Sequence, residues 1–367
     1  MKKIILIAAV AIAAAACSKT FDTNLATEKA IGFGTWAENL TKAEARVQGT
    51  STFLAGDTFA AYGYKETTSP AAKVTVFDNV TVTASGTPVD KWSYETLRFW
   101  DTNYDSYTFF AVSPSGAAAI APQAGTIAAT DKTFSGKNND ILVAGKVVVE
   151  KGSKPYFKGY HTVDFLFHHA SSLVDVKVKK SSALKDNEVK IKAFQFNNIA
   201  TEGKIAVSSY TYDSVNDKYL PVFTWTPNNN DGTYTTTSGV NEVTLPVTVV
   251  EDNAFDSANT DPDKTPAAAA AAYLINNLVV MPQEITTQTI TLTYTIQGDV
   301  VDHAVTLNFA DFDVIDNDNQ NDTTVGNWEA GKHYTFYITI DAHAIEFTAS
   351  IDSWDAVYVN GYHYILN

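Results

Sequence analysis

Cysteine is almost absent from this chain of 367 residues, since Cys17 is the only one. A single cysteine excludes a disulfide bond within the chain, and it also excludes zinc sites built on cysteine pairs. The fold must therefore be stabilised by burial of apolar surface. The composition, 45% hydrophobic and 12% aromatic, is ample for a core, and the length favours two domains over one.

Long apolar runs are also lacking, apart from residues 4–16, which follow a short cationic start. As a helix this run is about 20 Å long, well short of the roughly 30 Å hydrocarbon core of a membrane. We therefore expect residues 1–16 to be a cleaved signal peptide. The sequence Ala14-Ala15-Ala16 before Cys17 resembles a bacterial lipobox, whose cysteine is acylated, so we predict lipidation at Cys17. Ala14 stands where Leu or Val is usual, which keeps ordinary signal-peptidase cleavage as the alternative.

Positive charge is scarce, because 26 Lys and Arg residues face 41 Asp and Glu residues, for a formal net charge of −15. Such a chain repels nucleic-acid phosphates and anionic lipid surfaces, so we expect no nucleic-acid partner. The acidity indicates solubility rather than a particular function.

Motifs that carry catalysis or hold cofactors are missing. The chain has no phosphate-cradling glycine loop, no Gly-x-Ser-x-Gly elbow and no His-Glu-x-x-His helix. His168 and His169 are adjacent in an expected strand and point to opposite faces, so we expect one packed and one exposed histidine rather than a metal site. The acidic run 311–322 lacks the glycine and glutamate of an EF-hand, which favours a solvated loop over an irregular calcium site.

We therefore predict no catalytic residue, no cofactor and no metal site, and we expect that the protein is not an enzyme. A carboxylate pair for glycoside hydrolysis remains the distant alternative, because such pairs are close in space and not in sequence.

What the chain does contain is a long series of short β-branched and aromatic runs, separated by Gly, Pro, Asn, Asp and Ser. Several alternate strictly, as in Val174–Lys179, which is typical of antiparallel sheets with one wet face. Trp92–Phe99, Tyr107–Val112 and Ile141–Val149 are among the expected strands. No amphipathic helix recurs between strands. The pattern predicts an all-β fold of two tandem β-sandwiches with antiparallel sheets.

The expected organisation has five parts. After the signal peptide, residues 17–46 form a polar leader with one short strand, in which Ile31, Phe33 and Thr35 share a face. Residues 47–150 form the N-terminal sandwich, residues 151–354 the C-terminal sandwich, and residues 355–367 a terminal strand segment.

Several short motifs follow one another in a fixed order after the signal peptide. They are Ile31-Gly32-Phe33, Arg46, Gly56-Asp57-Thr58-Phe59, Tyr62-Gly63-Tyr64, Val76-Phe77-Asp78-Asn79, Trp92-Ser93-Tyr94, Phe165-Leu166-Phe167-His168-His169-Ala170, Val280-Met281-Pro282-Gln283, Trp328-Glu329-Ala330-Gly331-Lys332-His333-Tyr334 and Ile345-Glu346-Phe347. Because these motifs occur in this succession, the chain resembles the fimbrillin family, the subunits of the type V pili of Bacteroides-like bacteria.

The resemblance implies a lipoprotein precursor that is anchored to the outer membrane, trimmed by an arginine-specific protease, and polymerised with other fimbrial subunits by strand exchange at the cell surface. It further implies a role in adhesion to a host or bacterial surface ligand. Arg46 is the only arginine between Cys17 and Arg98, so we predict processing between Arg46 and Val47, in an exposed polar segment.

Two points stay open from the sequence. Residues 355–367 are predicted to donate the exchanged strand, with a last edge strand of the second sandwich as the alternative. The alternative function is an outer-membrane lipoprotein that binds glycans through exposed aromatics, although a core role is the commoner fate of strand tryptophans. The candidate aromatics are Trp92, Trp100, Trp225, Trp328 and Trp354.

Overall fold

The computed structural model describes residues 30–34, 53–87, 89, 91–134, 140–151, 162–184, 186–214, 218–228, 232–236, 243–244, 272–309, 313–314, 326–341, 345–353 and 357–358. Strands dominate these ranges, and the one helical element among them is a short 3-10 helix, Ser182–Leu184. No helix in the described ranges is long and apolar enough to cross a membrane. The prediction of an all-β chain is confirmed.

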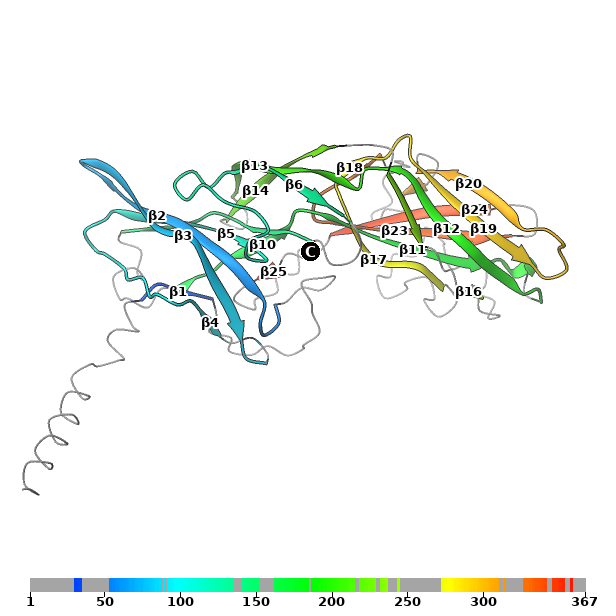
Figure 1. The fold of residues 1–367 in the computed structure, drawn as a ribbon, viewed down its shortest axis with the longest axis horizontal. Coiled ribbons are helices and arrows are strands. Elements are labelled where there is room, and N and C mark those ends of the chain that lie inside the picture. Colours follow the sequence, from blue (N-terminus) through cyan, green and yellow to red (C-terminus); the bar gives the residue numbers. More distant parts are fainter. Residues whose placement is uncertain are drawn as a thin grey trace, which may run out of the picture.

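The strands form two lobes that lie one after the other along the long axis (Figure 1). The first lobe is built on an eight-stranded sheet. From one edge to the other its strands are β4 (Lys91–Ser93), β3 (Ala71–Ser85), β2 (Thr58–Thr68), β5 (Ser106–Ser113), β7 (Leu142–Ala144), β10 (Leu166–His169) and β25 (Val357–Tyr358), with β8 (Val147–Glu150) paired to β5.

Two smaller sheets complete the first lobe. A three-stranded sheet contains β6 (Ile127–Thr133), β13 (Glu202–Asp213) and β14 (Lys218–Pro227). The other is a two-stranded pairing of β1 (Gly32–Phe33) with β9 (Thr162–Val163).

The second lobe is a sandwich of two five-stranded sheets. One contains β17 (Ala272–Val280), β11 (Ser172–Lys180), β23 (Lys332–Ile340), β24 (Ile345–Ser353) and β21 (Asp313–Val314). The other contains β15 (Gly232–Thr236), β12 (Val189–Ile199), β19 (Thr289–Ile296), β20 (His303–Asn308) and β16 (Val243–Thr244). A short pairing joins β18 (Gln283–Glu284) to β22 (Asn327–Trp328).

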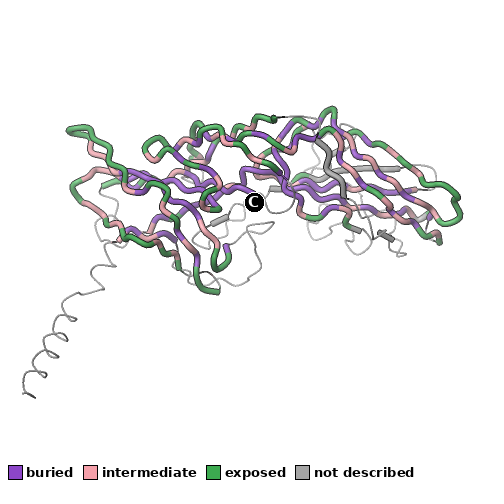
Figure 2. The backbone as a smooth tube through the Cα atoms, viewed as in Figure 1, coloured by how far each residue is buried: buried purple, intermediate pink, exposed green. Residues whose placement is uncertain are grey.

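The burial of each strand follows from its place in these layers (Figure 2). In β19, buried and half-buried residues alternate over most of the strand, since one face packs on the facing sheet and the other meets solvent. In β5, Tyr107 to Ser113 are all buried, because the sheet of the first lobe is covered on both faces. One face packs on the three-stranded sheet, and the other is covered by aromatic residues and by β1.

The sheets of the first lobe also contain strands from beyond residue 150, the expected end of the N-terminal sandwich. Strand β10 pairs with β7, and β13 pairs with β6, so segments beyond that position complete the sheets of the first lobe. The indole Nε1 of Trp225 donates a hydrogen bond to the carbonyl of Ala170 (2.7 Å), where the chain passes from β10 to β11. The division of the chain into separately folding units at residue 150 stays a prediction.

Most pairings are antiparallel, as expected, but the second lobe contains a long parallel one. Strand β11 lies parallel to β23 from Leu173↔His333 to Lys180↔Ile340. Parallel neighbours need a crossover and not a hairpin, and here the intervening chain builds the facing sheet and part of the first lobe.

Candidate functional site: the groove that holds the leader strand

The leader strand β1 occupies a groove in the first lobe. Ile31 and Phe33 are both buried, as is Gly34. The sequence predicted a strand here from the period-two placement of Ile31 and Phe33, and the structure confirms both the strand and the burial of those two side chains.

The backbone of the leader is held on two sides. On one side β1 pairs in parallel with β9, through Gly32↔Thr162 and Phe33↔Val163. On the other side, the amide of Ile31 donates to the carbonyl of Arg98 (2.7 Å). The leader is therefore inserted between two chain segments and is not merely laid along an outer edge.

The ring of Phe33 fills the centre of the groove. It lies 5.7 Å from the ring of Phe165 in a stacked arrangement and 5.2 Å from that of Phe77 in an edge-on one. Further edge-on contacts join it to Phe59, Tyr94 and Phe109. Full burial of an Ile or Phe side chain contributes about 1.5–3 kcal/mol, and aromatic pairs add to it.

The hydroxyl of Tyr94 links the leader to the wall of the groove by hydrogen bonds, and we call Tyr94 the clamp. Its hydroxyl donates to the carbonyl of Ile31 (2.6 Å) and accepts a hydrogen bond from the amide of Arg98 (3.2 Å). Burial raises the pKa of the Tyr94 hydroxyl, so it stays a neutral donor at physiological pH. The Nε of Arg98 donates in turn to the carbonyl of Val76 (3.2 Å), which ties the clamp to β3.

Loss of the leader would leave unpaired backbone groups on both walls and an apolar trough between them. Both are costly in water, because unpaired backbone groups and exposed apolar surface are each unfavourable.

Strand β25, in the tail segment, lies in the same lobe. Strand β25 pairs antiparallel with β10, through Leu166↔Tyr358 and Phe167↔Val357. The segment Phe165–Phe167 thus joins the two places, since Phe165 stacks on Phe33 and the next two residues pair with the tail. The described part of the tail adds to the sheet of the first lobe and not to a sheet of the second sandwich.

A family model described as fimbrillin-like matches residues 41–354. The chain belongs to the fimbrillin-like family. This confirms the resemblance inferred from the order of the sequence motifs, and the family supports a fimbrial subunit role. No curated protein matches the chain.

Solved structures are similar to this fimbrillin-like protein at low sequence identity, and the first two described here share its fold. A fimbrial protein from Bacteroides vulgatus is 16% identical, with a TM-score of 0.53 over 89% of this chain and 100% of that one. A protein from Bacteroides uniformis, named for a presumed role in cell adhesion, is 16% identical with a TM-score of 0.50 over 89% and 99%. The tip fimbrial protein Mfa3 from Porphyromonas gingivalis is 11% identical with a TM-score of 0.38 over 85% and 97%.

The predicted modification sites of this fimbrillin-like protein, Cys17, Arg46 and Val47, lie outside the described residues. In the sequence, Arg46 lies between two described residues that are buried in the first lobe, Gly34 and Phe53. Gly34 follows the buried leader strand, and Phe53 is buried against the rings of Trp92 and Phe167.

The two adjacent histidines have different surroundings. His169 is buried, and its Nδ1 lies 2.6 Å from Oδ2 of the buried Asp140. His168 is half-buried and not exposed as expected. Within the described ranges, no group of three or more His, Cys, Asp or Glu side chains could hold a metal ion. The sequence drew attention to His169, but no signal in it pointed to Asp140 as the partner.

The tryptophans that were weighed as sugar-stacking platforms pack against the hydrophobic clusters wherever the structure describes them, as the favoured core reading expected. Trp328 is buried, and the other three are half-buried and pack against the hydrophobic clusters. Those three are Trp92, Trp100 and Trp225, while Trp354 and most of the acidic run 311–322 lie outside the described residues.

Proposed function

We propose that this chain is a structural subunit of a cell-surface fimbria, which joins its neighbours by strand exchange after proteolytic removal of the leader, and which supports adhesion. The observation that carries the proposal is the insertion of β1 between the Arg98 segment and β9, with Ile31 and Phe33 buried. A leader held in this way is a placeholder whose removal opens a groove shaped for another strand.

Processing after Arg46 supplies the trigger in this proposal. Cleavage there separates the leader from Phe53, the next described point that is anchored in the core. The β1 segment is then retained only by its own contacts, and an incoming strand with more apolar residues can displace it. The tail, residues 355–367, is the proposed donor.

An arginine-specific protease makes a sharp test possible. In Arg46→Lys the charge is kept, so the precursor should fold as before but should not be cleaved. We expect wild-type assembled material to begin at Val47 by N-terminal sequencing, and Arg46→Lys to remain an unassembled precursor that contains Phe33. Lys42→Ala, which leaves Arg46 in place and adds no arginine, is the control in the same segment and should still be cleaved after Arg46. Assembled wild-type material that retains Phe33 would contradict the proposal.

Acylation at Cys17, with transport of the precursor to the outer membrane, completes the proposal. It rests on the signal peptide and the small residues that precede the only cysteine. We expect a fatty-acid analogue supplied to cells to label the wild type and not Cys17→Ala. Equal labelling of both, or of neither, would show that the cysteine is not the anchor.

A further inference from the structure

Two arginines, Arg46 and Arg98, are the only ones in the chain. A protease specific for arginine therefore has two bonds to attack, the bond after Arg46 and the bond between Arg98 and Phe99. The second bond lies within residues 94–105, which are all described and contain no strand. Leu97 and Phe99 are 45% and 47% exposed. Exposed segments outside regular structure are preferred sites of proteolysis, so the position of Arg98 alone would make it a second cleavage site.

The leader strand pairs with both residues of this bond. The amide of Ile31 donates to the carbonyl of Arg98 (2.7 Å), which is the carbonyl that a protease would attack. Ala30 and Phe99 face each other in an isolated antiparallel bridge. The backbone on both sides of the bond is thus already paired with another segment of the chain. A paired backbone must open locally before a protease can bind it.

The remaining hydrogen bonds of Arg98 are mostly local. Its amide donates to the hydroxyl of Tyr94 (3.2 Å), and its side chain donates to the carbonyls of Val76 (3.2 Å) and Thr96 (3.1 Å). Tyr94 and Thr96 lie in the same irregular segment as Arg98 itself, and the Tyr94 hydroxyl is oriented by its own bond to the carbonyl of Ile31. Without the leader, the bond to Val76 is the one hydrogen bond in the described chain that would still join Arg98 to a strand.

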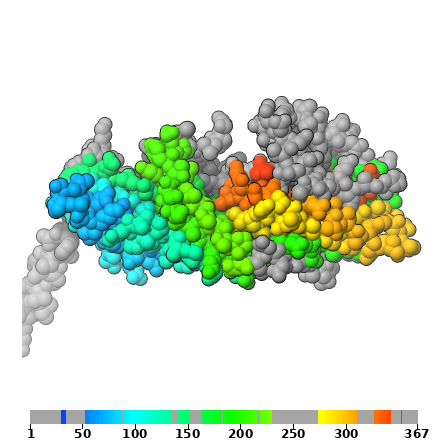
Figure 3. All heavy atoms as spheres, turned by 90° about the horizontal axis from the view of Figure 1, so that it is seen from above, coloured from blue at the N-terminus to red at the C-terminus, as the bar shows by residue number. Residues whose placement is uncertain are grey.

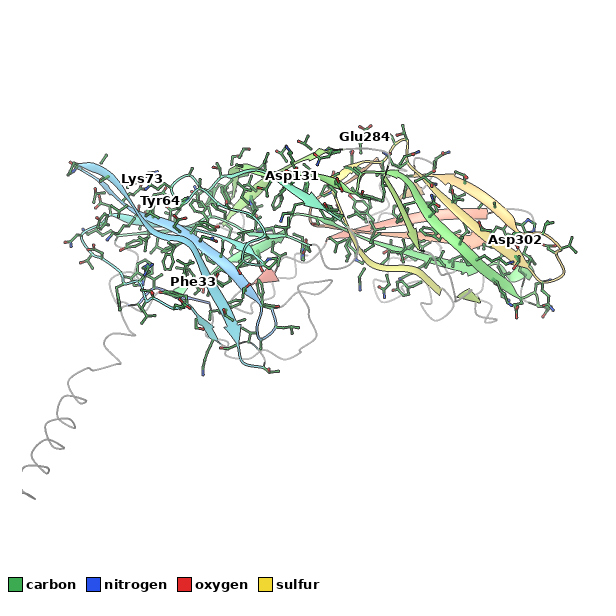
Figure 4. All side chains as sticks on the ribbon, viewed as in Figure 1. Phe33, Tyr64, Lys73, Asp131, Glu284 and Asp302 are labelled. Atoms are coloured by element: carbon green, nitrogen blue, oxygen red, sulfur yellow. The ribbon has the colours of Figure 1, made fainter. Side chains whose placement is uncertain are left out.

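Packing on the leader also holds the segment that contains Tyr94. The ring of Phe33 lies 5.7 Å from that of Tyr94 in an edge-on arrangement, and Figure 4 shows Phe33 within the first lobe. Loss of the leader would remove this ring contact together with the pairing to Ile31. The segment would then open more often. Cleavage of a segment that opens and closes rapidly follows the population of its open form.

We infer that the strand in the groove protects the Arg98–Phe99 bond, and that a subunit which loses the leader without gaining another strand is cut there by the protease that released the leader. The inference rests on the proposed function for the event that empties the groove. Hydrolysis adds the hydroxyl of water to the carbonyl carbon of Arg98 and a hydrogen to the nitrogen of Phe99. The cut separates Tyr94 from Trp100, which packs on Tyr107 (4.8 Å). The wall of the groove is thereby broken, and the subunit can no longer accept a strand.

Digestion of the purified full-length Arg46→Lys chain with an arginine-specific endoprotease tests the protection, because Arg98 is then the only arginine. We expect little cleavage, since the leader stays in the groove. In the double variant Arg46→Lys with Phe33→Ala, the leader is held less tightly, and the fragment that begins at Phe99 should form about tenfold faster. Equal rates in the two chains, or no such fragment from either, would overturn the inference.

A substitution in the second lobe controls for a general loss of stability. Val305→Ala, added to Arg46→Lys, shortens a side chain that packs on the core of that lobe. Residues near position 300 lie at the end of the molecule opposite the blue residues of the first lobe (Figure 3). This variant should leave the rate of cleavage after Arg98 unchanged. Acceleration equal to that caused by Phe33→Ala would contradict protection by the leader.

A synthetic peptide of residues 28–36 gives an independent measurement. Added in excess to the Phe33→Ala double variant, it should refill the groove and slow the cut after Arg98. The same peptide with Ile31→Ser and Phe33→Ser should have no effect, because it lacks the two side chains that the groove buries. Equal rates with the two peptides would contradict the inference.

These digestions involve no assembly step, so their outcome is separate from that of the proposed function. Wild-type polymers that retain the leader would overturn the proposed function, whereas the protection of Arg98 would still be read from the purified variants. Normal processing and assembly, with no effect of Phe33→Ala on cleavage after Arg98, would overturn this inference alone.

Discussion

At the scale of single residues, the neighbours His168 and His169 show how one step along a strand changes the surroundings of a side chain. His169 is paired with Asp140 at 2.6 Å, and both side chains are buried. His168 has a buried Nε2 with no hydrogen-bond partner within the described ranges. Burial, together with the electrostatic effect of the neighbouring His169 and Lys218, lowers the pKa of His168 to about 4.

This low pKa makes the folded state sensitive to mild acid. An unfolded histidine has a pKa of about 6.5, so the unfolded chain binds more protons than the folded chain between pH 6.5 and pH 4. The contribution of neutral His168 is fully present above pH 6.5 and is lost as the pH falls toward 4, by roughly 3 kcal/mol in total. Urea unfolding of wild type and His168→Gln at pH 7 and pH 4.5 should show a smaller drop for the variant. Equal drops would assign the acid sensitivity to other groups.

The leader residues were predictable at this scale, whereas the histidine partner was not. Ile31 and Phe33 alternate in sequence, and alternation is the property that decides which side chains of a strand are buried. Asp140 meets His169 because β7 and β10 are neighbours in the sheet. Strand order depends on the packing of the whole chain, and no local pattern around Asp140 encodes it.

At the scale of elements, the sequence predicted which segments form strands better than it predicted where those strands end. Trp92–Phe99 was expected as one strand, but β4 ends at Ser93. The following residues leave the sheet, because the hydroxyl of Tyr94 and the carbonyl of Arg98 bind the leader. The residues after Ser93 have the composition of a strand, but they form one wall of the groove that holds β1.

The run Ile141–Val149 was also expected as one strand and forms two, β7 and β8. They are separated at Gly145, where the carbonyl of Tyr219 on β14 approaches so closely that a Cβ would clash with it. The break therefore has a cause in tertiary packing, which the composition of the run does not reveal.

The tail is the element whose role can be tested most cleanly. Its described part, β25, pairs with β10 through two residues. Removal of β25 takes away an edge of the first-lobe sheet, and among the described residues the hydrophobic clusters contain none from the tail. Deletion of Asp355–Asn367 should therefore leave a folded, exported and cleaved monomer that does not polymerise.

The readouts separate a donor strand from an intrinsic edge strand. Thermal unfolding should differ little between the truncated and the full-length monomer, and unheated detergent gels should show a ladder only for the full-length chain. Loss of soluble folded protein would favour an intrinsic edge strand, and polymers of normal length from the truncated chain would exclude the donor role.

At the scale of the whole molecule, the two lobes are visible but the chain does not divide between them at one point (Figure 1). The first lobe takes β10, β13 and β14 from beyond residue 150. Two sandwiches could be inferred from the series of strands, because alternating runs with no helices leave few other architectures. The return of β13 and β14 to the first lobe is a long-range pairing, and strand composition carries no information about it.

This interleaving makes a prediction about folding that also tests the expected domain boundary. A fragment of residues 47–150 lacks β13 and β14, so Ile205 and Val207 no longer cover the face that holds Tyr62 and Phe110. It also lacks Phe165 and Phe167, which belong to the aromatic cluster on the other face. Each missing buried side chain removes about 1.5–3 kcal/mol, and a few such losses equal the 5–15 kcal/mol by which a typical domain is stable. We therefore expect the fragment to be unfolded by circular dichroism and amide exchange, while residues 47–353 expressed as one chain give a cooperative transition. A fragment 47–150 that folds cooperatively by itself would establish residue 150 as a true domain boundary and would show that the later strands dock on a core already formed.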